Sequence, residues 1–357
     1  QNVLKITGGT IPVKSGGGST AASKSNTTAA PNMMGRQGTT TTTTAAADTE
    51  SMKALKATSL IYISGGTVSI NSQDDALHSG NSLQITGGTF TIAAGDDAIH
   101  AENSIQIDGG SINITASYEG VEAAAITING GDTKLVSSDD GFNGSESTSS
   151  TSSTTTSAQP QGFMMGGGAG GGMESSGKAT LVINGGNIYM NAGGDGLDCN
   201  GSITMTGGTV FVDGPTDNGN GPIDYDSSFK ITGGTLIAAG SSGMAQQPSE
   251  ASNGCSVLVT LNSKAAGSVF TIKDSSGNTI IEYKPSKAYS SVAVYSTKLN
   301  TTSTYSFSVA GTEIKSTALS KNVSTISETG AASSGMNGGM NGGGMNGAPA
   351  NGGGKVR

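Results

Sequence analysis

Short alternating runs of apolar and polar residues cover most of the chain before residue 255. Each run holds about five residues rich in Val, Ile, Leu, Thr and Phe, as in SLQIT and TFTIA, and a Gly-Gly pair separates successive runs. Such alternation is typical of strands with one buried face, and Gly-Gly between two strands predicts a tight corner. Helical periodicity is nowhere sustained, so the pattern predicts an all-β chain.

The pattern repeats every 22 residues: Asp74 and Asp96 are separated by this distance, and so are His78 and His100. A fixed period of this length is typical of a solenoid, in which stacked units bury their apolar sides against one another. We therefore predict a right-handed parallel β-helix with about 22 residues per coil. Each strand would pair with the same strand one coil away, ~4.8 Å distant.

Three low-complexity segments interrupt or follow this pattern. Residues 15–50 and 144–177 are rich in Ser, Thr and Gly and are expected to loop out of the helix, and residues 330–357 form a Gly/Met/Asn-rich tail. Over residues 255–329 the runs lengthen and turn residues join them, which predicts a small antiparallel β unit. Because a solenoid needs a covered end, we interpret this unit as a C-terminal cap on the β-helix of residues 1–254. An independent ligand-binding module is the alternative.

The chain opens on Gln inside a strand–corner–strand phrase, LKITGGTIPV, and carries no signal-peptide pattern. We expect a processed or trimmed product, from which upstream coils were removed. The first strand would then be an open edge that favours pairing with another subunit, so a homo-oligomer or end-to-end filament is one hypothesis. No apolar run reaches the length of a membrane helix.

Carboxylates recur at one point of each coil. In register they form two columns, which consist of Asp74, Asp96 and Asp139, and of Asp75, Asp97, Glu119, Asp140 and Asp195. Like charges ~5 Å apart at an effective dielectric near ~20 repel by about 3 kcal/mol, and no Lys or Arg lies inside these phrases. Calcium takes six to eight oxygen ligands and would neutralise them, so we predict a calcium-binding edge. The alternative is that these side chains accept hydrogen bonds from turn amides and bind no ion.

His78 and His100 fall in a third column beside the acidic ones. The same column continues with Glu122, Asn143 and Asp198. Two histidines do not complete a zinc site, so we interpret them as surface rungs next to the acidic edge. Cys199 and Cys255 could pair, but two cysteines do not make a disulfide framework.

Several phrases together resemble a known family. They are ISGGTVSINSQDDALHS, GGTFTIAAGDDAIHA, GGSINITASYEGVEA, VDGPTDNGNGPIDYD and GGTLIAAGSSGMAQ, within residues 52–315. They resemble the calcium-binding, polysaccharide-lyase-like carbohydrate-binding β-helix family of secreted clostridial proteins, which bind cellulose and pectin. The resemblance implies a secreted, extracellular or cell-surface protein that binds several calcium ions and plant cell-wall polysaccharide, including acidic sugars. The family's Asp-rich phrases correspond to Asp74, Asp75, Asp96, Asp97, Asp139 and Asp140, whereas the third coil departs with SYEGVE.

Composition narrows the class of ligand. The chain has no Trp, eight Tyr and seven Phe, too few for a broad stacking platform on crystalline cellulose. Its net charge of −8 would repel polyuronates unless calcium offsets it. We therefore expect the protein to bind an acidic or polar polysaccharide without cleaving it.

A polysaccharide lyase is the competing hypothesis. It would need a Lys or Arg base, and Lys53 and Lys56 stand one coil before Asp75 and His78. These lysines can equally neutralise the acidic column. No arginine lies between residues 37 and 356 to hold a substrate carboxylate, so we do not expect an enzyme.

Overall fold

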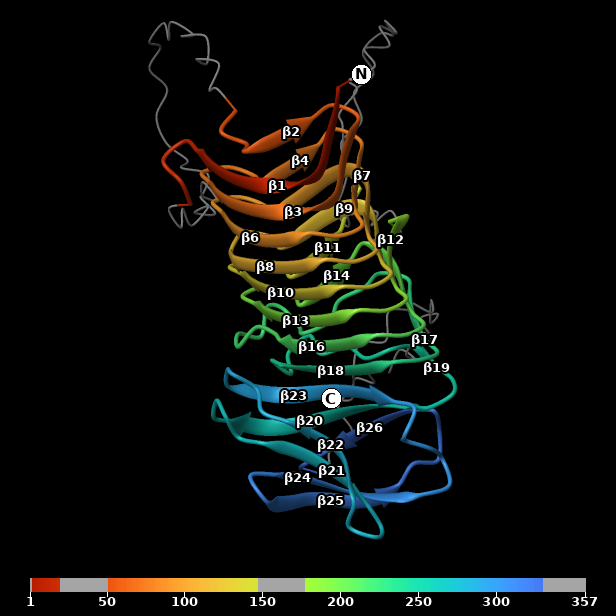
Figure 1. Cartoon of the computed structure of the whole chain (residues 1–357). Helices are drawn as coiled ribbons and strands as arrows, with labels where there is room; N and C mark the ends of the chain where they lie inside the picture. The colour runs from red at the N-terminus through yellow and green to blue at the C-terminus, as the bar shows by residue number, and fades with distance from the viewer. Residues whose placement is uncertain (1, 20–50, 147–176, 330–357) are drawn as a thin grey trace, which may run out of the picture.

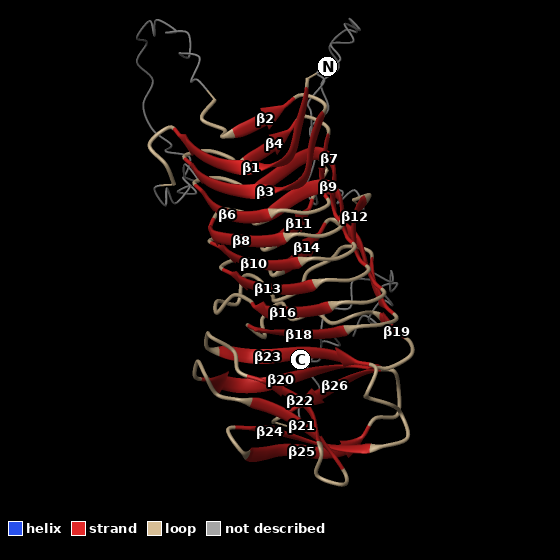
Figure 2. Ribbon diagram, in the orientation of Figure 1, coloured by secondary structure: helices blue, strands red, loops and turns tan. Residues whose placement is uncertain are grey.

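The computed structural model describes residues 2–19, 51–146 and 177–329. The insertions predicted at 15–50 and 144–177 lie mostly outside these ranges, and the tail at 330–357 lies wholly outside them. Every regular element of the described chain is a β-strand (Figure 2). No described helix is therefore long and apolar enough to cross a membrane.

Three columns of strands form a stack of coils that runs down the molecule (Figure 1). Column 1 precedes the Gly-Gly corner and contains the first parts of β1 (Val3–Ser15) and β3 (Leu60–Ser72), then β5 (Ser82–Ile85), the second parts of β7 (Ile99–Ile107) and β9 (Val121–Ile128), β12 (Ala179–Ile183), β15 (Gly201–Met205), β17 (Ser228–Ile231) and β19 (Glu250–Ala251). Column 2 follows the corner and contains the second parts of β1 and β3, then β6 (Thr89–Ala94), β8 (Ser111–Ala116), β10 (Asp132–Ser137), β13 (Asn187–Ala192), β16 (Thr209–Asp213) and β18 (Thr235–Gly240). Column 3 follows the acidic phrase and contains β2 (Leu55–Ala57), β4 (Leu77–Ser79), the first parts of β7 and β9, β11 (Phe142–Gly144) and β14 (Leu197–Cys199).

Each strand pairs in parallel with its equivalent in the next coil. Ile63 pairs with Ile85 and Ile85 with Ile107, at the predicted spacing. The register also resumes across both low-complexity segments, where Ile6 pairs with Ile63 and Leu135 with Met190. The prediction of an all-β solenoid with mostly parallel pairing is confirmed, and its right-handed sense stays a prediction.

Stacked apolar ladders fill the interior of the coils. Equivalent positions of successive strands hold one buried side chain each, such as Ile61, Leu83 and Ile105 in column 1. Burial of a side chain of this size stabilises the fold by ~1.5–3 kcal/mol. One coil alone buries few of them, so the stability of the solenoid comes from stacking.

The last coil is covered by the C-terminal strands. β18 pairs antiparallel with β23 (Tyr289–Ser296), which pairs antiparallel with β20 (Cys255–Lys264). β20 pairs in parallel with β26 (Val323–Ser327), so this unit is not purely antiparallel as predicted. A second sheet contains β22 (Thr279–Tyr283), β21 (Phe270–Asp274), β24 (Thr304–Val309) and β25 (Thr312–Ala318).

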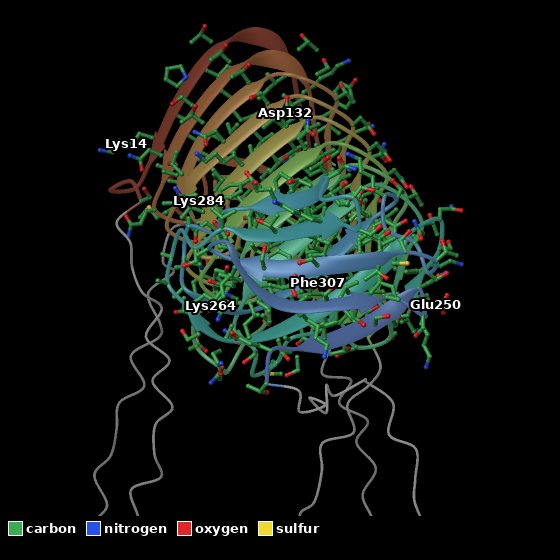
Figure 3. All side chains as sticks on the ribbon, turned by 90° about the horizontal axis from the view of Figure 1, so that it is seen from below. Lys14, Asp132, Glu250, Lys264, Lys284 and Phe307 are labelled. Atoms are coloured by element: carbon green, nitrogen blue, oxygen red, sulfur yellow. The ribbon has the colours of Figure 1, made fainter. Side chains whose placement is uncertain are left out.

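This C-terminal unit has a hydrophobic core of its own, with Phe270, Tyr305 and Phe307 fully buried. Figure 3 shows the molecule from this end, with Phe307 among the strands that lie across the stack. Since outward-facing Ile237 of β18 belongs to the same core, the unit closes the edge and one face of the last coil. Cys199 and Cys255 are both buried and free, so the possible disulfide does not form.

Candidate metal centre at the acidic edge

The predicted carboxylates line one edge of the stack, between columns 2 and 3. Backbone hydrogen bonds fix their register: the amide of Tyr118 donates to the carbonyl of Asp96 at 2.9 Å, and that of Asp139 to the carbonyl of Tyr118 at 3.0 Å. We call this set the acidic edge: Asp74, Asp75, Asp96, Asp97, Glu119, Asp139, Asp140 and Asp195. Column 3 places a neighbouring line beside it, which contains His78, His100, Glu122, Asn143 and Asp198.

At the N-terminal end of the acidic edge, the chain supplies its own cation, Lys53. The ammonium of Lys53 contacts Asp74 at 3.1 Å and also donates to Asp75. The Asp75 carboxylate also lies 2.8 Å from Nδ1 of His78 and accepts a hydrogen bond from the backbone amide of Asp97 at 3.3 Å. Asp75 is only 2% exposed. Burial alone would raise its pKa, but the hydrogen bonds from His78 and Lys53 hold that pKa well below the ordinary value. The first carboxylate pair therefore has a cation of the chain, Lys53, in contact with both of its members.

His100 takes the same role one coil further on. Its Nδ1 lies 3.2 Å from Asp97 and 2.8 Å from Glu122, and its ring stacks on His78 with centroids 4.9 Å apart. Burial opposes the charged imidazolium, but the hydrogen bonds with Asp97 and Glu122 prevail and raise the pKa of His100 to about 10. His100 is thus a counter-ion of the acidic edge as well as a rung beside it.

In the middle of the acidic edge, buried carboxylates lie close together and repel one another. Burial, together with the charges of Glu122 and Asp97, raises the pKa of Glu119 to about 9, although Asn143 Nδ2 donates to it at 2.9 Å. The Oδ1 atom of the same Asn143 is buried and has no hydrogen-bond partner among the described residues. A buried acceptor of this kind is normally satisfied by water or a cation.

At the C-terminal end three carboxylates converge. Asp195, Asp198 and Asp224 each place a side-chain oxygen within 4.8 Å of the other two. Within the described parts of the chain, no Lys or His forms an ion pair with them. Burial and the neighbouring carboxylates, Asp140 foremost, raise the pKa of Asp198 to about 8. Burial first, and then the charge of Asp224, likewise raises the pKa of Asp195 to about 6.

The C-terminal end has the donor set that calcium prefers. All three side chains offer carboxylate oxygens, whereas the group of Asp75, Asp97 and His100 includes an imidazole nitrogen that already bonds carboxylates. Two other clusters consist of oxygens only, but each has a cation in contact with two of its members. Lys53 contacts Asp74 and Asp75 in the cluster with Asp96, and His100 contacts Asp97 and Glu122 in the cluster with Glu119. These residues fit a calcium ion best at Asp195, Asp198 and Asp224.

Two of these three residues are absent from the carboxylates predicted as metal ligands. Asp198 follows from the repeat, since it pairs with Asn143 in column 3. Asp224 does not, because its coil is longer: Ser202 pairs with Ser228, 26 residues away, so a search at a spacing of 22 passes it by. The bridge between Leu197 and Ile223 brings it beside Asp198.

Part of the chain is similar to a carbohydrate-binding family. Residues 1–98 and 96–141 match the model of a family described as carbohydrate-binding domain-containing protein, and they include most of the acidic edge. No curated protein and no solved structure matches the chain. The similarity supports carbohydrate binding by the solenoid.

Proposed function

We propose that this is a secreted calcium-binding protein, a right-handed parallel β-helix, that binds acidic polysaccharide of the plant cell wall or another source without cleaving it. The proposal that calcium binds rests on the convergence of Asp195, Asp198 and Asp224, which form no ion pair with a described residue. The family similarity over residues 1–98 and 96–141 supports the polysaccharide part. Bound calcium would also reduce the repulsion between a protein of net charge −8 and a polyanion.

Asp195, Asp198 and Asp224 would hold the ion, with Asp140 next to them. When bound, a calcium ion can be coordinated both by carboxylates of the protein and by a uronate carboxylate. The chain's part is to hold these carboxylates at fixed positions. The backbone amide of Gly221 donates to Asp195 at 2.5 Å, and Gln246 donates to Asp224.

The lysine nearest the acidic edge is a poor general base. Burial tends to lower the pKa of Lys53, but its hydrogen bonds with Asp75 and Asp74 outweigh this and raise it. A base that abstracts a proton at neutral pH should have a pKa near that pH. Lys53 stays protonated and tied to two carboxylates, which supports binding without cleavage.

Calorimetric titration tests the proposal directly. Asp198→Asn/Asp224→Asn should lower calcium affinity at least ~10-fold, because two of three charged ligands are lost. The matched control Glu250→Gln/Glu282→Gln removes the same charge from exposed positions and should leave calcium affinity unchanged. Polygalacturonate should bind the wild-type protein in calcium and release in chelator, without the absorbance of unsaturated products. Equal calcium affinity of the two double variants would contradict the proposal.

End-to-end assembly into filaments, as in a structural surface or matrix protein, stays the alternative. β1 pairs with β3 and with no second strand among the described residues. Its other edge offers backbone groups that a second molecule could pair with.

A further inference from the structure

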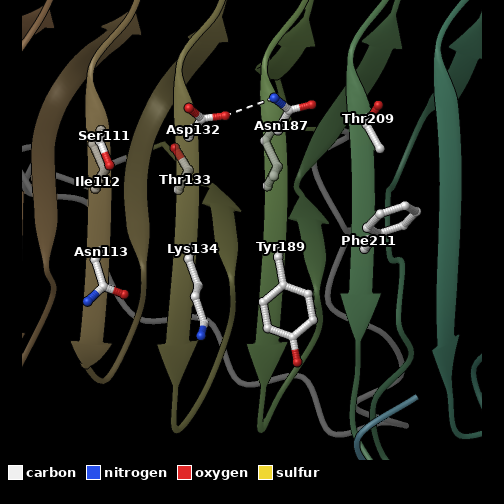
Figure 4. A pocket seen from close by; sticks show the side chains of 11 residues that line it. Ser111, Ile112, Asn113, Asp132, Thr133, Lys134, Asn187, Tyr189, Thr209 and Phe211 are labelled. Carbon is white, nitrogen blue, oxygen red and sulfur yellow. Dashed lines mark hydrogen bonds between the residues drawn. The ribbon is translucent and has the colours of Figure 1, made fainter. Parts of the chain in front are cut away.

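A groove of about 350 Å³ lies on the outer face of column 2, over β8, β10, β13 and β16. The acidic edge follows the C-terminal ends of these strands, so the groove is a separate feature of the same coils. Register pairing arranges the outward-facing side chains of its lining in two rows across the strands (Figure 4). The rows are Ser111, Asp132, Asn187 and Thr209, and Asn113, Lys134, Tyr189 and Phe211.

The second row changes character along the stack. In the earlier coils the same position holds Ser69 and Thr91, which are small and polar. From β10 onward it holds Lys134, Tyr189 and Phe211, so a cation and two aromatic rings stand side by side on successive strands. Neighbouring strands lie ~4.8 Å apart, so the three side chains form one continuous surface.

A buried carboxylate fixes the aromatic part of this surface. Asp213 is 2% exposed and accepts hydrogen bonds from the hydroxyls of Tyr189, at 2.8 Å, and Tyr283, at 2.7 Å. It also accepts one from the amide of Ser286 at 3.0 Å. The ring of Phe211 stacks on that of Tyr283 with centroids 5.3 Å apart. The rings are therefore held in place before any ligand arrives, which lowers the entropic cost of binding.

The polar part of the groove lies beside these rings. Lys134 is exposed, and its ammonium stands 6.0 Å from the centroid of the Tyr189 ring. In the other row, Asn187 Nδ2 donates to Asp132 at 2.8 Å, and the pair keeps further donor and acceptor capacity for a ligand (Figure 4). The groove thus combines an apolar platform, a hydroxyl-binding pair and one cation.

A pyranose ring of a uronic acid carries the complementary groups: an apolar C–H face, a rim of hydroxyls and a carboxylate. We propose that the groove binds a uronate unit of an acidic polysaccharide. Tyr189 and Phe211 contact the ring face, Asp132 and Asn187 bond hydroxyls, and Lys134 pairs with the carboxylate. A single lysine next to an aspartate is too little positive charge for a nucleic-acid backbone. The inference rests on the proposed function and adds a binding site apart from the acidic edge.

Titration with oligogalacturonate in saturating calcium tests the groove. Lys134→Met and Tyr189→Leu should each lower affinity about 10-fold or more, since each removes a central contact. The chain offers matched controls: Lys230→Met removes an exposed lysine from column 1, and Tyr62→Leu removes a tyrosine that stands beside Lys5 there. Both controls should bind like the wild type, and calcium affinity should be unchanged in all four variants.

Thermal melts check that each variant is folded, and exposed Lys134 keeps the test valid if Tyr189→Leu is unstable. Wild-type affinity in folded Lys134→Met, with binding by the wild type itself, would overturn the groove and leave the proposed function standing. A wild-type protein that binds no oligogalacturonate would overturn both. Equal affinity for a neutral galacto-oligosaccharide would overturn the uronate assignment.

Discussion

At the scale of single residues, counter-charges of the acidic edge reach across to neighbouring coils. Lys53 lies one coil before Asp75, and His100 bonds Glu122 one coil after it. The acidic phrases contain no Lys or Arg, so a search for these residues within each phrase misses the contact between Lys53 and Asp75. The charge balance of a solenoid has to be counted across strand pairs, because equivalent residues of adjacent coils are contact neighbours.

Lys53→Met should lower the free energy of unfolding by about 1–3 kcal/mol, because it leaves the buried carboxylate of Asp75 with less compensation. Lys56→Met is the matched control. Lys56 lies in the same coil and pairs with His78 in the strand register, but it is exposed and forms no ion pair with another described residue. Denaturant unfolding in chelator measures both changes. Equal losses for the two lysine variants would show that Lys53 does not serve as a counter-ion.

At the scale of the repeating element, the Gly-Gly corner sets how closely coils approach. A Cβ atom on Gly233, the first glycine of its pair, would lie too close to the carbonyl oxygen of Thr206 in the preceding coil. Gly8 occupies the same repeat position in the first described coil, where a Cβ would meet no described atom within 4 Å. The glycine is needed where one coil stacks on another.

Gly233→Ala should therefore cost about 1–3 kcal/mol of stability through overpacking against the neighbouring backbone. Gly8→Ala should be neutral or stabilise slightly, since it only restricts the unfolded chain. Both substitutions are identical in chemistry and repeat position, so the difference in their melting temperatures isolates the contact between coils. A destabilised Gly8→Ala would mean that the corner itself, not the stacking, requires glycine.

The sequence predicted those features that follow the strict period. The pairing of Leu55 with Leu77, and the two columns of carboxylates, follow from a spacing of 22 residues. Asp224 could not be found in this way, because a longer coil shifts it out of phase. The groove could not be predicted either. Asp213 bonds both Tyr189 and Tyr283, and Tyr283 lies 70 residues after Asp213 in the chain. Only the packing of the C-terminal unit on the coils brings these residues together.

At the scale of the whole molecule, charge is graded along the stack. The N-terminal coils carry the counter-ions Lys53 and His100 on the acidic edge. The C-terminal coils carry Asp140, Asp195, Asp198 and Asp224, which form no ion pair with a described residue. The groove lies on the outer face of the later coils and is braced by the C-terminal unit. The cap thus covers the last coil and also shapes a binding surface.

This gradient predicts how stability depends on pH. Burial, with neighbouring carboxylates, raises the pKa of Asp97 and of Asp140 to about 7 and that of Glu119 to about 9, so above the ordinary value near 4 the native state keeps protons that the unfolded chain has lost. Hydrogen bonds with Asp97 and Glu122 raise the pKa of His100 against the effect of burial, and its contribution is lost as pH rises toward about 10. The contributions of Asp97, Glu119, Asp140 and His100 to the free energy of unfolding therefore all decrease as pH rises.

In chelator, the melting temperature should therefore decrease from pH 6 to pH 9. The contribution of Asp75, whose pKa is lowered, is already complete in this range and does not offset the decrease. Calcium should stabilise the protein most at the alkaline end, where the carboxylates are ionised, and each ion at ~100-fold over its dissociation constant adds about 2.7 kcal/mol. Scanning calorimetry at four pH values, with and without calcium, measures both slopes. In the Asp198→Asn/Asp224→Asn variant, the melting temperature in chelator should still decrease as pH rises. Calcium should raise the melting temperature of this variant much less than that of the wild type. The two results together distinguish the effect of the buried carboxylates from the effect of the bound ion.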